Sequence, residues 1–181
     1  MKTQTLSCKP PTMSLLRLCC LAFFLTIAGQ ASAQREPMVL YNFIDIPVAV
    51  PSATKERVKT AITRAALFIS WNIVEEPDGA LLASWSRVGD YGMKVRITYD
   101  EAKYSLVYVD SFGLRVSSAK DLMNFPDDMM ARALAVQAAR FKDWAETPYM
   151  VKTENYIHLT YEDDVRGLLA SIRRHLLAPA I

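Results

Sequence analysis

The sequence predicts an α+β domain, in which a four-stranded antiparallel sheet, with a fifth strand as an alternative, carries helices on one face. Three observations predict this class. Apolar residues recur with a helical period before Trp71, they alternate in short segments from there to Ser111, and helical periods return after Pro126. Consecutive strands joined by short turns pair antiparallel, so this segregated order favours a meander with its helices on one side.

The first 33 residues are predicted to be a cleaved export signal. Residues 18–28 (LCCLAFFLTIA) form an apolar run, which is shorter than the roughly 20 residues that a spanning helix needs. Ala31-Ser32-Ala33 follows with the small residues that signal peptidase accepts, so we expect Gln34 to be the mature N-terminus. A retained membrane anchor is the alternative. Met1 and Met13 are both possible starts, and either yields the same mature chain.

Removal of this signal changes the chemistry of the chain. All three cysteines lie in it, together with three of the 21 Lys and Arg residues and no acid, so 18 basic and 19 acidic residues remain. A near-neutral chain without a basic run is not typical of proteins that bind nucleic acid or anionic membranes. Without cysteine, disulfides and thiolate sites are excluded, and the mature chain also has no Asn-x-Ser/Thr sequon. These absences favour a bacterial periplasmic or secreted location.

The mature chain is predicted to open with a strand and a helix. An apolar run at residues 38–46 is expected to add an edge strand before Pro47, which lacks a donor for a ladder. A helix is expected over about 55–70, with Thr54 as its N-cap. Its apolar stripe consists of Val58, Ala61, Ile62, Ala65, Ala66 and Ile69.

Four strands follow, at residues 71–76, 80–86, 93–100 and 104–110. Pro77-Asp78-Gly79 is expected to turn the first strand into the second. The third strand alternates apolar Val95 and Ile97 with polar Lys94 and Arg96, which predicts one wet face. The fourth strand is fairly apolar on both faces, so we expect it at the centre of the sheet.

Two helices are expected after the strands. The first begins near Pro126 and ends near Ala145. The last begins at Thr160, which together with Asp163 matches a Thr-x-x-Asp capping box. Its buried face is predicted to consist of Val165, Leu168, Leu169, Ile172 and Leu176.

The segment from about 120 to 149 is predicted to be a helical insertion that binds a protein partner, with another envelope protein as the candidate. Its helix carries apolar residues on more than one side, whereas a helix that covers a sheet needs one stripe, and methionines suit adaptable contacts. The alternative is that the segment covers one end of the core. The candidate partner-binding residues are Met129, Met130, Leu134, Phe141 and Trp144.

The two histidines limit the acid–base chemistry. His175 lies in the last turn of the final helix, where it is expected to interact with the helix dipole. His158 could act as a base that activates Ser111, with Asp110 orienting the histidine. The chain would then be a small cofactor-independent hydrolase. No nucleophile-elbow glycine pattern surrounds Ser111, so we favour a structural His158 at the entry to the last helix.

Other chemistries lack their motifs in this chain. There is no calcium-loop spacing, phosphate-binding glycine loop or dinucleotide fingerprint, so no cofactor and no metal are expected. Tyrosines on the third and fourth strands suit sheet packing better than a sugar- or peptide-binding ladder. These tyrosines are Tyr99, Tyr104 and Tyr108.

Three segments carry a family resemblance: Val95-x-Ile97-x-Tyr99-Asp100, Tyr104-Ser105-Leu106-x-Tyr108-x-Asp110-Ser111, and Ile157-His158-x-x-Tyr161. Over roughly residues 58–172 the chain resembles a group of small uncharacterised exported bacterial proteins, many of them classed as lipoproteins. The resemblance implies an α+β fold and an envelope location, and it implies no particular activity. The chain departs from the group at two points. Glu162 and Asp164 replace an Asn and a Trp, and about forty residues separate the last predicted strand from Ile157.

Together these observations predict a periplasmic or secreted binding or protein-interaction module that is non-catalytic and needs no cofactor. The hydrolase of Ser111, His158 and Asp110 is the alternative prediction.

Overall fold

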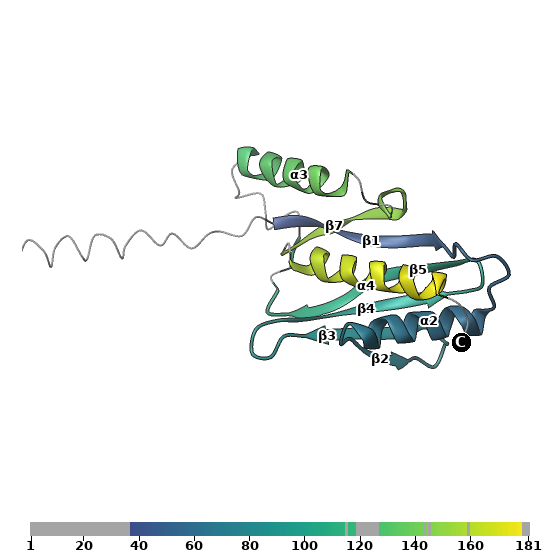
Figure 1. The fold of residues 1–181 in the computed structure, drawn as a ribbon. Coiled ribbons are helices and arrows are strands. Elements are labelled where there is room, and N and C mark those ends of the chain that lie inside the picture. Colours follow the sequence, from purple (N-terminus) through teal and green to yellow (C-terminus); the bar gives the residue numbers. More distant parts are fainter. Residues whose placement is uncertain are drawn as a thin grey trace, which may run out of the picture. The chain divides into compact units, whose positions relative to one another are not determined.

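A single antiparallel sheet organises the protein (Figure 1). The computed structural model describes residues 37–114, 116–118, 127–142, 144, 146–158 and 160–178. Within these residues the sheet has seven strands in the order β2-β3-β4-β5-β1-β7-β6. The strands are β1 (Pro37–Pro47), β2 (Asn72–Glu75), β3 (Leu81–Ser86), β4 (Gly92–Tyr99), β5 (Lys103–Phe112), β6 (Ser117–Ser118) and β7 (Met150–His158). The helices are α2 (Lys55–Phe68), α3 (Asp127–Phe141), the 3-10 helix η1 (Thr147–Tyr149) and α4 (Thr160–Leu177).

The α+β class is confirmed, but the predicted number of strands is too low. The four predicted meander strands form β2 to β5, and β5 lies at the centre of the sheet as expected. The strands that the sequence did not indicate are β6, which has two residues, and β7. Ile157 is the one buried side chain of β7, so this strand shows no apolar alternation.

The first strand is not at the edge of the sheet, so that prediction is wrong. One side of β1 pairs with β5, and the other side pairs with β7. Pro47 is tolerated because it is the last residue of the strand. A register shift between Phe43 and Ile46 brings Asp45 to a φ of 58°, and the Asp45 amide donates to Ser105 Oγ over 2.9 Å. This bulge bends β1 before its last residues.

The predicted first helix is confirmed, together with its cap. Thr54 Oγ1 accepts a hydrogen bond from the Arg57 amide, over 3.2 Å. The chain leaves α2 through Ser70, whose φ of 63° ends the helical path. Trp71 follows directly and is buried.

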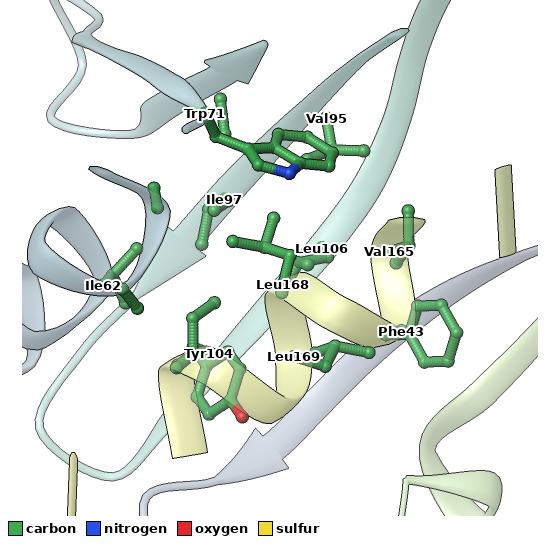
Figure 2. Packing of buried hydrophobic residues seen from close by; sticks show 14 of the residues in the cluster. Phe43, Ile62, Trp71, Val95, Ile97, Tyr104, Leu106, Val165, Leu168 and Leu169 are labelled. Carbon is green, nitrogen blue, oxygen red and sulfur yellow. The ribbon is translucent and has the colours of Figure 1, made fainter. Parts of the chain in front are cut away.

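The core lies between the sheet and the pair α2 and α4, which run side by side across one face (Figure 1). All five residues of the predicted buried face of the last helix are buried. Figure 2 shows Leu168 of α4 beside Leu106 of β5, with Trp71 close to Val95 at one side of the cluster. Alternation in β4 also follows the prediction, because Val95 and Ile97 are buried while Lys94 is exposed.

Helix α3 is attached to β1 and to the first turns of α4. The side chain of Gln137 bonds both backbone groups of Val39, with its oxygen accepting over 3.1 Å and its nitrogen donating over 2.8 Å. The same nitrogen donates to the carboxyl group of Glu162. An ion pair between Arg140 and Asp163 adds a second link to α4. The helix ends at Phe141, four residues before its predicted end at 145.

Candidate functional site

Ser111 and Asp110 lie next to each other near the end of β5. Both line a hollow of about 220 Å³, here called the Ser111 hollow. Its other lining residues are Asn72, Ser84, Trp85, Ser86, Gly92, Met93, Lys94 and Phe112. Two members of the predicted hydrolytic set therefore share one depression.

The bonds of Ser111 and Asp110 are made within their own strand. Ser111 Oγ lies 2.9 Å from the hydroxyl of Tyr108, and the Ser111 amide donates to Asp110 Oδ1 over 2.8 Å. Asp110 thus bonds the backbone beside it, which is a common local role for a short acidic side chain.

His158 lies at the end of β7, and β1 separates that strand from β5. His158 Nδ1 accepts from the Thr160 amide over 3.2 Å and lies 2.7 Å from the Thr160 hydroxyl. His158 is not among the residues that line the Ser111 hollow. The histidine therefore faces the entry to α4, which is the structural position that we favoured from the sequence.

His175 also bonds its own helix. Its Nδ1 lies 2.9 Å from the carbonyl oxygen of Ser171, so this nitrogen donates to one of the last carbonyls of α4. Its ring packs against Phe68 of α2.

Some of the candidate partner-binding residues make contacts inside the fold, and one of those described lies at the surface. Phe141 is buried, stacks on Trp144, and meets the ring of Tyr41 edge-on. Trp144 also meets the ring of Phe43 edge-on. Leu134 is 38% exposed. Met129 and Met130 fall within α3, and their side chains lie outside the described part of the structure.

A second hollow, of about 150 Å³, is lined by two buried polar side chains, those of Glu146 and Tyr104. We call it the Glu146 pocket. It forms where β1 ends, β5 begins, and the C-terminal part of α4 passes over them. The lining residues are Ile46, Pro47, Ala49, Tyr104, Glu146, Tyr149, Arg173, Leu176 and Leu177. Apolar walls with a few convergent polar groups are typical of small-molecule sites.

Glu146 and Tyr104 are the buried polar residues of this pocket. The side chain of Glu146 is 7% exposed, and Tyr104 as a whole is 2% exposed. Figure 2 shows the Tyr104 ring beside Leu169, with its hydroxyl oxygen pointing away from Leu106 and Leu168. Glu146 pairs with Arg173, and neither its carboxylate nor the Tyr104 hydroxyl is among the fully buried atoms that lack a hydrogen-bond partner in the described structure.

Arg173 supplies the positive charge of the pocket. Its Nη1 lies 3.8 Å from Glu146 Oε1, which is an ion-pair distance but is too long for a hydrogen bond. The Arg173 side chain is 56% exposed, so it lies at the rim, whereas Glu146 lies inside. Burial, with a smaller contribution from the Glu146 charge, raises the pKa of Tyr104. The phenol therefore keeps its proton at neutral pH and is available as a donor.

A third polar group is buried at the start of α4. Glu162 is 4% exposed, its Oε1 accepts from Gln137, and its Oε2 is buried without a hydrogen-bond partner in the described structure. Burial is the main cause that raises the pKa of Glu162 to about 7, while the Gln137 hydrogen bond acts in the opposite direction. This carboxyl group is packed between α3, α4 and β1 and lines neither hollow.

No three His, Cys, Asp or Glu side chains gather as a metal-binding group in the described parts of the chain. Likewise, none of the described helices is long and apolar enough to cross a membrane.

Sequence patterns point to Tyr104 but not to Glu146 or Arg173. Tyr104 stood out as one of three clustered tyrosines, and the favoured packing role fits its burial. Glu146 follows the predicted end of a helix, and Arg173 lies among charged residues of α4, so neither carries a motif. Their meeting depends on the path from α3 to β7, which local patterns do not reveal.

Comparisons of the chain with protein-family models, with curated proteins and with solved structures give no match. The resemblance to small exported bacterial proteins therefore stays a prediction from the motifs.

Proposed function

We propose that the chain is an exported, non-catalytic binding module of the bacterial periplasm or exterior, and that the Glu146 pocket is its ligand site. One observation carries the proposal: two polar side chains, each more than nine-tenths buried, line the same small hollow, and a guanidinium group lies at its rim 3.8 Å from the carboxylate. Polar groups in a mostly apolar hollow offer a ligand hydrogen bonds and ion pairs at low dielectric, where such interactions are stronger than in water.

Hydrolysis by Ser111, His158 and Asp110 has less support. A catalytic base must come within hydrogen-bond reach of its nucleophile, and in the described structure the hydroxyl of Ser111 bonds Tyr108 while His158 Nδ1 faces Thr160. The Ser111 hollow is also lined mostly by strand residues without an oxyanion-binding motif.

Filling the mouth of the pocket tests the proposal. Ala49 is an exposed lining residue, so Ala49→Trp should occlude the hollow without disturbing the core. We expect pooled amino acids, sugars and small carboxylic acids at millimolar concentration to shift the amide NMR signals of Ile46 and Leu176 in the parent protein. The same shifts should be lost in A49W.

Ala170→Trp is the matched control, because Ala170 is exposed on α4 and does not line the pocket. A170W should respond as the parent protein does. If no compound moves the pocket signals, or if A49W responds like the parent, the pocket is not a ligand site.

A further inference from the structure

The two charges of the Glu146 pocket are opposite in sign and close together. Glu146 Oε1 and Arg173 Nη1 are 3.8 Å apart, and the pair has no net charge. The groups are also unequally placed, with the carboxylate inside and the guanidinium at the rim. A ligand in the pocket therefore meets a negative group in its depth and a positive group at its entrance.

The walls around this pair are aliphatic on one side. Ile46 and Leu176 are buried lining residues, and Leu177 is exposed at the same hollow. A hollow of about 150 Å³ corresponds to the liquid volume of about five water molecules. The pocket therefore suits a small molecule with a short apolar part and two charged ends.

We propose that the Glu146 pocket binds a free α-amino acid with a small aliphatic side chain, placing its ammonium group on Glu146 and its carboxylate on Arg173. This inference rests on the proposed binding function and names the chemical class of its ligand. The hydroxyl of Tyr104 adds a donor from the floor of the pocket, and the aliphatic wall receives the side chain.

A zwitterion fits this arrangement better than either ion alone. A simple cation gains from Glu146 but is repelled by Arg173 a few ångströms away, and a simple anion meets the reverse problem. A molecule with both charges lies antiparallel to the ion pair and satisfies both groups. In a peptide the two charges belong to different residues, so one terminus alone lacks this match.

Isothermal titration of the purified protein with four probes tests the inference. The probes are L-valine, isobutylamine, isovalerate and glycyl-valine. Isobutylamine lacks the carboxylate of valine, isovalerate lacks its ammonium group, and glycyl-valine separates the two charges. We expect valine to bind at least tenfold more tightly than each of the other three.

Two substitutions assign each charge to its partner. In Arg173→Gln the preference for valine over isobutylamine should disappear, because the carboxylate has lost its partner. In Glu146→Gln the preference for valine over isovalerate should disappear. Arg174→Gln, at an exposed neighbour that does not line the pocket, should keep all preferences of the parent protein.

The outcomes separate this inference from the function on which it rests. If other pooled compounds shift the pocket signals while valine binds no more tightly than isobutylamine or isovalerate, the ligand class is wrong and the binding function stands. If glycyl-valine bound more tightly than valine, the pocket would recognise a peptide terminus and not a free amino acid, and the inference would be overturned. If A49W also fails to change any response, the binding function fails as well.

Discussion

Glu162 shows how one residue in this protein combines a structural bond with a buried charge. Its carboxyl group holds the amide nitrogen of Gln137, and its second oxygen has no partner among the described residues. Arg140 and Arg166 lower its pKa and Asp163 raises it, but burial is the largest cause. The folded state therefore holds the proton of Glu162 up to a higher pH than the unfolded state does.

The substitution Glu162→Gln tests this electrostatic cost. The pKa of Glu162 is about 7 in the fold against 4.5 for the free group, so the folded state binds more protons than the unfolded state between these values. Stability is then expected to fall as pH rises from about 4.5 through 7, by roughly 3 kcal/mol in all. A glutamine side chain cannot ionise, so the variant should lose this dependence and be more stable than the parent at pH 8.

Urea unfolding at pH 4.5, 6, 7 and 8 measures the effect. Glu154→Gln is the matched control, because Glu154 is exposed on β7. The control should keep the pH dependence of the parent protein. If the free energy of unfolding changed equally with pH in E162Q and in the parent, ionisation of Glu162 would not be the source of the pH dependence.

At the scale of elements, one polar side chain of α3 bonds directly to the backbone of the sheet. Gln137 is 2% exposed and bonds the amide and the carbonyl of Val39, in a part of β1 that lies beyond its paired residues with β5. The aromatic contacts of Phe141 and Trp144 lie further along the same segment. These contacts favour the alternative interpretation of the segment as a cover for one end of the core. Among the candidate partner-binding residues whose side chains the structure describes, Leu134 is the exposed one.

Gln137→Leu should remove the hydrogen bonds that link α3 to Val39 and to Glu162. Leucine has a similar volume but no polar atoms, so the backbone groups of Val39 and the Glu162 carboxyl lose their partner. The expected cost is about 1–3 kcal/mol for each buried group left unpaired. Urea unfolding should show the loss of stability, and amide hydrogen exchange should be faster at Val39.

Ala135→Leu provides the control for this substitution, since Ala135 is exposed on the same helix. Its stability and its exchange rate at Val39 should match those of the parent. If amide hydrogen exchange at Val39 were the same in Q137L as in the parent, the Gln137 hydrogen bonds would not be what protects this part of β1.

At the scale of the whole molecule, the sheet order brings distant segments into one site. The Glu146 pocket takes residues from β1, from β5, from the connection before η1 and from α4. The first strand pairs with β5 and β7, so it joins the predicted meander to the C-terminal strands. The proposed export signal, residues 1–33, lies outside the described residues.

Export predicts a defined N-terminus for the mature protein. Cleavage after Ala33 should yield a chain that starts at Gln34 and carries no lipid, because the cysteines near the apolar run are removed with it. Mass spectrometry of the protein from the envelope fraction of its host measures this. An intact segment 18–28, or an acylated cysteine, would contradict the prediction.

The sequence by itself determined the α+β class, the four meander strands and the helices at 55–68 and 160–177. These elements could be predicted because each buries one face, and burial of one face leaves a period of 3.6 or 2 residues in the sequence. Only the tertiary structure decided the internal position of β1, the strand β7 and the Glu146 pocket. β7 is held by backbone pairing with β1 and buries little, so it leaves no period. The pocket joins Tyr104, Glu146 and Arg173 from three separate segments, and nothing in their local sequence encodes that meeting.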